Sequence, residues 1–138
     1  MSDEKAKILK INDVFKLNLS IPDYQRPYKW TVENVQQLLE DLLYHFDENQ
    51  KPYRIGTLIT HKNVEYNDIV DGQQRITTLF LILYCLRSDF RKNIKLNYKH
   101  SISYNNIIIN KNFINEFISE NLSGKHDLYY DYILNKCE

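Results

Sequence analysis

Five consecutive residues in the middle of the chain bring together groups that bind phosphate: Asp71, Gly72, Gln73, Gln74 and Arg75. A short apolar run ends just before them and a longer one begins just after, which predicts a strand that leads directly into a helix. The first turn of a helix has unpaired backbone N–H groups and the positive end of the helix dipole, and both attract anions. Gly72 permits the close approach of a ligand or another backbone, and the guanidinium of Arg75 matches a phosphate. The stretch therefore predicts an anion site.

The remaining side chains of this stretch extend the prediction to a nucleotide or a nucleic-acid phosphate. Gln73 and Gln74 can donate or accept hydrogen bonds to a base, a ribose or a water molecule. Asp71 could hold Mg²⁺ or orient water, because one carboxylate and the phosphates of a substrate often share a magnesium ion. A purely structural interpretation is also open at this point: Asp71 and Gly72 form a turn, Arg75 pairs with a carboxylate, and the glutamines lie on the surface.

A second segment, IPDYQRPYKW, carries a similar pair of residue types at Gln25 and Arg26, again just after a predicted strand. We expect the two segments to face one pocket. The alternative is that the aromatic residues Tyr24, Tyr28 and Trp30 cover the core, with Arg26 as a stacking or ion-pair partner.

Two helices and a hairpin are predicted to position these residues. From Val32 to Phe46 the apolar residues repeat at the helical period, and Thr31 is a suitable N-cap. The helix after Arg75 is apolar on nearly every side as far as Leu86, so we expect it to be buried all round. The segments YRIGTLIT and VEYNDIV, joined by HKN, predict a β-hairpin.

Two further elements are predicted before the helix that begins at Val32. KLNLSIP alternates like a half-buried strand, and ILKINDVF predicts a short helix with Ile8, Ile11 and Phe15 facing inward. Gly56, in the first strand of the hairpin, indicates a bulge or a position that another group approaches closely.

Beyond Arg91 the pattern is less regular. IKLNY and SISYNNIIIN have the character of strands, whereas the apolar residues from Phe113 to Ile118 are spaced as in a helix. Gly124 is a suitable helix stop, and DLYYDYILNKCE after it predicts a last helix that continues to Glu138. We therefore expect the chain to be cut short within that helix.

Composition indicates a soluble protein of one domain. Its 138 residues suffice for one hydrophobic core, and 43% of them are hydrophobic. Lys plus Arg and Asp plus Glu each number 18, so the net charge is zero and long-range attraction to a polyanion is not expected. Cys85 and Cys137 lack the spacing of a disulfide framework or a zinc site, and no apolar run is long enough for a membrane span. We therefore expect a cytoplasmic protein without a membrane partner.

Three segments, in this order, resemble the hallmarks of the N-terminal domain of the GmrSD type IV restriction enzymes: IPDYQRPYKW, RIGTLIT and YNDIVDGQQRITTLFLI. The most specific is the Asp-Gly-Gln-Gln-Arg motif, complete from Asp71 to Arg75, and the resemblance covers residues 8 to about 90. It implies an α+β fold of the ParB/sulfiredoxin-like kind, with a small mixed sheet packed against helices and a helical C-terminal extension. We expect a flexible arm over residues 1–7, the DGQQR domain over 8–95, and an extension over 96–138 that is a truncated part of the same domain.

The resemblance also implies a function: a nucleotide-binding, NTP-hydrolysing regulatory domain of a bacterial system that restricts modified phage DNA. Mg²⁺ and a nucleoside triphosphate would be the cofactors, and DNA would be reached through a partner nuclease domain or subunit. Asp71 would hold the metal and act in catalysis together with Gln74. The residues that would bind the nucleotide and its phosphates are Gln25, Arg26, Gly56, Gly72, Gln73 and Arg75.

In the family that the chain resembles, the nuclease is a separate C-terminal domain with a His-Asn-His metal site. The four histidines of this chain are scattered and form no close pair at zinc or nuclease spacing, so we expect no nuclease domain in it. A DNA-binding or nuclease domain of the ParB-like type is the alternative, although zero net charge argues against strong autonomous binding to DNA. A third hypothesis is a protein-interaction or toxin-antitoxin module in which the polar corner is only structural. Basic residues around both arginine segments would favour DNA, and a closed pocket at a free helix N-terminus would favour nucleotide.

Overall fold

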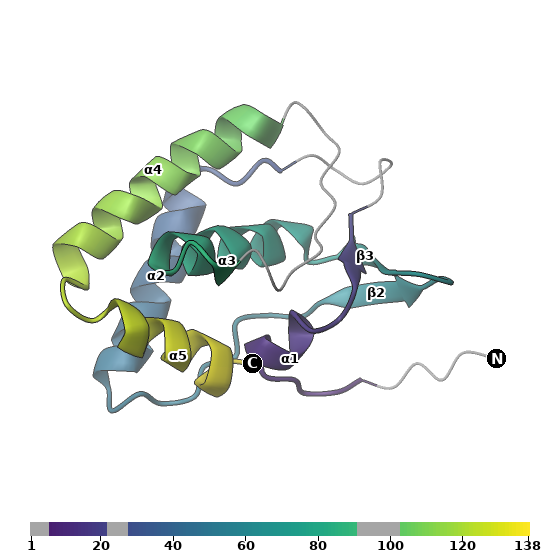
Figure 1. The fold of residues 1–138 in the computed structure, drawn as a ribbon, viewed down its shortest axis with the longest axis horizontal. Helices are drawn as coiled ribbons and strands as arrows, with labels where there is room; N and C mark the ends of the chain where they lie inside the picture. Colours follow the sequence, from purple (N-terminus) through teal and green to yellow (C-terminus); the bar gives the residue numbers. More distant parts are fainter. Residues whose placement is uncertain (1–5, 22–27, 91–102) are drawn as a thin grey trace.

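The computed structural model describes residues 6–21, 28–90 and 103–138. Within these ranges the chain has an α+β fold, as predicted, with five helices and one mixed sheet of three strands. The elements in chain order are α1 (Ile11–Val14), β1 (Leu19–Ser20), α2 (Val32–Asp47), β2 (Ile59–Lys62), β3 (Asn67–Asp71), α3 (Gln73–Leu86), α4 (Ser103–Asn121) and α5 (His126–Lys136). Figure 1 shows the sheet at one end of the molecule and the longer helices at the other.

The sheet has the strand order β1-β3-β2, and it is mixed because β1 is parallel to β3 whereas β2 is antiparallel to it. The predicted hairpin is confirmed, but its first strand begins at Ile59 rather than at Tyr53. Tyr53 instead forms a parallel bridge with Cys137, and the backbone N–H of Ile55 donates to the carbonyl of Glu138 over 2.7 Å. The first part of the predicted strand therefore pairs with the end of the chain.

Helix α2 has the predicted face and the predicted start. Its buried residues follow the helical period, and they are Val35, Leu38, Leu39, Leu42 and Phe46. Thr31 is the N-cap, and its backbone N–H donates to Oδ1 of Asn34 over 3.1 Å, so an amide of the first turn satisfies a backbone group at the helix start.

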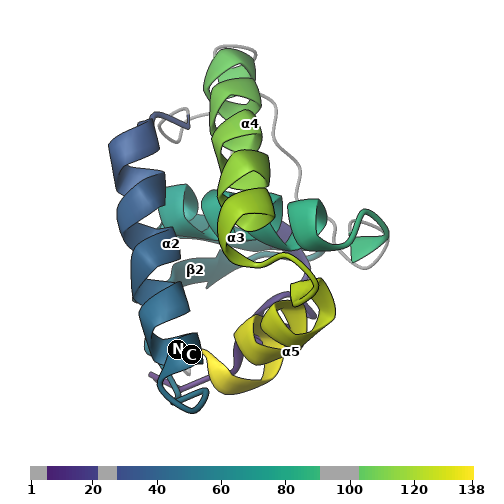
Figure 2. The ribbon, with the colours of Figure 1, turned by 90° about the vertical axis from the view of Figure 1, so that its left-hand side faces the viewer.

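Helix α3 is the central helix of the fold. Nine of its fourteen residues are buried, so the helix is covered on most sides but not all round as predicted. Figure 2 shows α2, α4 and α5 arranged around it. Its first residue follows directly on Gly72 and the end of β3, so α3 leads from the sheet into the helical part of the molecule.

The prediction of a strand at SISYNNIIIN is wrong, because residues 103–110 of this segment belong to α4. Three consecutive isoleucines suggested a strand, but Ile108 and Ile109 are exposed. The residues of α4 that face the interior are Asn110, Ile114 and Ile118, at helical spacing, and a polar residue at the first of these positions hid the period. The predicted strand IKLNY lies outside the described residues.

Two expectations near the ends of the described chain are corrected. Helix α5 ends at Lys136, and Cys137 is extended, with φ −90° and ψ 150°, so that it can pair with Tyr53 instead of continuing the helix to Glu138. In the first segment Ile11 and Phe15 are buried as predicted, but Ile8 is 64% exposed because α1 begins only at Ile11.

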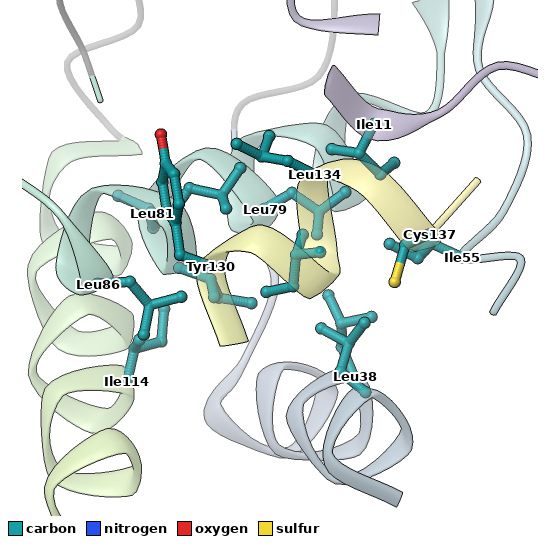
Figure 3. Close-up of a cluster of buried hydrophobic side chains, with 14 of the residues drawn as sticks. Ile11, Leu38, Ile55, Leu79, Leu81, Leu86, Ile114, Tyr130, Leu134 and Cys137 are labelled. Atoms are coloured by element: carbon teal, nitrogen blue, oxygen red, sulfur yellow. The ribbon is translucent and has the colours of Figure 1, made fainter. Parts of the chain in front are cut away.

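All five helices contribute to one hydrophobic core (Figure 3). The cluster includes Leu38 of α2, Leu79 and Leu86 of α3, Ile114 of α4 and Leu134 of α5. Residues from the predicted C-terminal extension therefore pack into the same core as those of the predicted DGQQR domain. No described helix combines the length and the apolar character that crossing a membrane requires.

Candidate functional site

The junction between β3 and α3 depends on the backbone of Gly72. This residue has φ +98°, a conformation that favours glycine, and a Cβ added to it would lie 2.8 Å from the carbonyl oxygen of Thr57 and 3.1 Å from Cδ1 of Leu58. The close approach expected at Gly72 is therefore made by the segment that precedes β2. The turn places the last residue of β3, Asp71, beside the first turn of α3.

The start of α3 has the backbone groups of an anion site. Its first intrahelical hydrogen bond runs from the N–H of Ile76 to the carbonyl of Gly72 over 3.1 Å, so the N–H groups of residues 73–75 precede the hydrogen-bonded part of the helix. No side chain of the N-cap residue covers them, because that residue is Gly72. These N–H groups and the helix dipole favour a negative charge at this point.

Arg75 is exposed, and it lies against Trp30 and Gly56, which carry no negative charge. Its guanidinium carbon is 5.9 Å from the centroid of the Trp30 ring, a cation–π arrangement. A Cβ on Gly56 would lie 3.1 Å from Cδ and 3.3 Å from Nη1 of Arg75, so the glycine makes room for the arginine side chain. Three ion pairs form within the described residues, and none includes Arg75. The structural alternative, in which Arg75 pairs with a carboxylate, does not occur in this part of the chain.

Tyr53 extends this surface toward the end of α2, and sequence reasoning missed it. Its hydroxyl donates to Oδ2 of Asp41 over 3.3 Å, and its ring stacks on His45 with centroids 4.4 Å apart. Burial raises the pKa of Tyr53 and Asp41 adds to this rise, while the positive charge of Arg75 partly offsets it. Tyr53 therefore stays a hydrogen-bond donor at neutral pH. The available signal was its place three residues before Gly56 in the same predicted strand.

The two glutamines of the motif have different surroundings. Gln74 is half-buried, and its Oε1 accepts hydrogen bonds from the backbone N–H groups of Lys29, over 2.8 Å, and Trp30, over 3.2 Å. Gln73 is buried, and Oγ1 of Thr77, one turn further along the same face of α3, has no hydrogen-bond partner among the described residues. Gln74 thus binds the segment that carries Trp30, whereas Gln73 lies on another side of the helix.

Asp71 is exposed at the end of β3, so its carboxylate is open to solvent. Among residues 6–21, 28–90 and 103–138 no group of three or more His, Cys, Asp or Glu side chains could enclose a metal ion. A magnesium ion at Asp71 would take its other ligands from phosphate oxygens and water, which is the arrangement that this ion accepts most readily.

The structure thus brings Gly56, Gly72, Arg75 and the start of α3 together, with Trp30 beside Arg75 and with Tyr53 close enough for the charge of Arg75 to act on it. Gln25 and Arg26 lie outside the described residues, so the expectation that their segment and the motif face one pocket stays a prediction. Of the aromatic residues in the same segment, Tyr28 is fully buried and Trp30 packs against the core, as the structural alternative for this segment expected.

Fold and site together define a small α+β module in which a strand, a glycine and a helix present an exposed arginine that pairs with no carboxylate of the described residues. A model of the family described as the N-terminal domain of the GmrSD restriction endonuclease matches residues 8–137. The chain belongs to this family, and the match extends the resemblance seen in its motifs to the helices α4 and α5.

The chain is also similar to an uncharacterized protein of Methanocaldococcus jannaschii. The two are 25% identical over 100 residues, and the match covers 59% of this chain and 17% of that protein. The chain therefore aligns with only a small part of the length of this curated relative.

Proposed function

We propose that this chain is the nucleotide-binding regulatory part of a restriction system, and that the start of α3 holds the phosphates of a nucleoside triphosphate. The observation that carries the proposal is Arg75. It is held against Trp30 and Gly56 next to the backbone N–H groups that precede the hydrogen-bonded part of α3, and it has no carboxylate partner in the described chain. An arginine in such surroundings is suited to bidentate binding of a phosphate.

Hydrolysis is the second part of the proposal. Asp71 is the last residue of β3 and directly precedes Gly72. Its exposed carboxylate can hold Mg²⁺ or orient a water molecule. When bound, Mg²⁺ would neutralise charge that develops on the phosphates. We place the DNA-cleaving activity in a partner domain or subunit, in keeping with the family of restriction endonucleases to which the chain belongs.

Binding is tested by titrating the chain with each of the four ribonucleoside triphosphates in the presence of Mg²⁺. Trp30 is the only tryptophan, so its fluorescence reports directly on the neighbourhood of Arg75, and calorimetry supplies an independent dissociation constant. We expect one nucleotide to bind and Arg75→Ala to abolish most of the affinity without unfolding the chain. A charge-assisted hydrogen bond contributes about 1.5–3 kcal/mol, which corresponds to a loss of roughly ten- to a hundredfold.

The matched control is Arg87→Ala, at the other end of α3. Arg87 is also exposed and also lies over an aromatic ring, with its guanidinium carbon 5.2 Å from the centroid of Tyr130. Equal affinities of the wild type and Arg75→Ala would exclude the proposed site. Binding of duplex DNA in the same assay, without binding of any nucleotide, would favour the ParB-like alternative.

A further inference from the structure

We propose that Asn110 of α4 is a positioning residue for this phosphate site, because it holds the segment that supports Arg75. The inference rests on the proposed function and extends it to an element that the motif does not contain. Asn110 is 1% exposed, and its Nδ2 donates two hydrogen bonds, to the hydroxyl of Tyr28 and to the backbone carbonyl of Trp30, both over 2.9 Å. Trp30 and Asn110 are 80 residues apart in the sequence.

Helix α4 also holds the start of this segment. Nδ2 of Asn106, one turn before Asn110, donates to the backbone carbonyl of Tyr28 over 3.0 Å. Two asparagines on one face of α4 therefore bind two carbonyl groups of residues 28–30. Hydrogen bonds are directional, so this pair determines where the segment lies along the helix, which apolar packing alone would leave less defined.

Helix α3 binds the same segment from its other side. Oε1 of Gln74 accepts from the backbone N–H groups of Lys29 and Trp30, as described above. Oγ1 of Thr78 lies 2.6 Å from the hydroxyl of Tyr28, and the Thr78 hydroxyl also lies within 2.8 Å of the carbonyl of Gln74. Donors from α4 and acceptors from α3 thus clamp residues 28–30 between the two helices.

The clamp acts on the site through Trp30. Within residues 6–21, 28–90 and 103–138 no carboxylate pairs with Arg75, so the contacts that define its position there are the ring of Trp30 and the backbone at Gly56. Loss of the two hydrogen bonds from Asn110 would free the carbonyl of Trp30 and let its ring move. The guanidinium of Arg75 would then lose the support that directs it toward a phosphate.

The test compares Asn110→Ala with Asn115→Ala, which removes an exposed asparagine from the same helix. Both variants are titrated with the nucleoside triphosphate that the wild type binds best, at a temperature at which circular dichroism shows them folded. We expect Asn110→Ala to lose affinity about tenfold, the effect of one to two hydrogen bonds, and Asn115→Ala to match the wild type. Asn106→Ala, at a half-buried position, supplies the same readout if Asn110→Ala does not fold.

Two further measurements separate positioning from a loss of stability. In the absence of ligand, quenching of Trp30 by acrylamide should increase in Asn110→Ala and remain unchanged in Asn115→Ala. In an Arg75→Ala background, Asn110→Ala should cause little further loss of the residual affinity, because the two residues act through one contact.

Each outcome decides between the two proposals. Wild-type affinity in folded Asn110→Ala would overturn the positioning role and leave the nucleotide site intact. Additive losses in the double variant would also overturn it, because Asn110 would then act independently of Arg75. A wild type that binds none of the four nucleotides would overturn the proposed function, and the positioning role with it.

Discussion

Replacement of Gly72 by alanine tests the geometry of the strand-to-helix junction. Two costs are expected. A residue with a side chain at φ +98° is strained by about 1–2 kcal/mol, and the new Cβ would lie 2.8 Å from the carbonyl oxygen of Thr57, which forces a backbone shift that typically costs about 1–3 kcal/mol. We therefore expect Gly72→Ala to lower the free energy of unfolding by about 2–5 kcal/mol.

Gly124 provides a matched control, because it isolates the first of these costs. It also has a positive φ, +76°, but a Cβ added to it would meet nothing within 4 Å. Gly124→Ala should therefore cost only the strain, about 1–2 kcal/mol. Urea unfolding followed by Trp30 fluorescence and by circular dichroism measures both values. Equal losses in the two variants would refute the argument, since the segment around Thr57 could then not be packed against Gly72 as described.

Two other predictions concern the arginine and the buried end of the chain. Gly56→Ala would place a Cβ 3.1 Å from Cδ of Arg75, a flexible side chain that can move away. The free energy of unfolding should therefore change by less than about 1 kcal/mol, while the nucleotide affinity measured by calorimetry should fall about fivefold. Unchanged affinity would contradict the contact between Gly56 and Arg75. Burial raises the pKa of the Cys137 thiol from 9.0 to about 12, so the folded chain keeps a proton that the unfolded chain releases. The contribution of Cys137 to the free energy of unfolding should therefore be constant below pH 9 and be lost as the pH rises from 9 to about 12. Urea unfolding of Cys137→Ala should show a smaller fall over this range, and the same slope in both proteins would exclude this cause.

The motif from Asp71 to Arg75 combines residues with different tasks. Gly72 is required by the backbone, and Gln74 binds the segment that carries Trp30. Arg75 carries a positive charge that no ion pair among the described residues compensates. The hydrogen bonds of Gln74 favour a positioning role for this glutamine. The catalytic function that we predicted for it is not tested by these contacts and stays a prediction.

The pairing of the chain end with the segment before β2 links distant parts of the fold to the site. The backbone N–H of Glu138 donates to the carbonyl of Tyr53 over 2.9 Å, and Ile55 donates to the carbonyl of Glu138. Gly56 and Thr57, which contact Arg75 and Gly72, follow directly. The segment after α5 therefore helps to define the wall of the candidate site, although nothing in its own sequence indicates a contact there.

The sequence by itself determined the features that depend on neighbours along the chain. Helices α2 and α3 were predictable from apolar side chains three to four positions apart, and the hairpin from side chains two positions apart. The motif predicted the start of α3 at Gly72, and together with its flanking segments it identified the family. These features were predictable because each element carries its own apolar pattern.

Only the tertiary structure decided what surrounds Arg75. Trp30, Gly56 and Asn110 lie on three separate segments, and no local pattern indicates that a buried asparagine of α4 would hold the carbonyl of Trp30. The same asparagine is the reason why the start of α4 was predicted to be a strand, because it occupies a core position at which the helical period calls for an apolar residue. Its burial is favourable only where the packed fold supplies two acceptors, and that partnership exists in three dimensions and not along the chain.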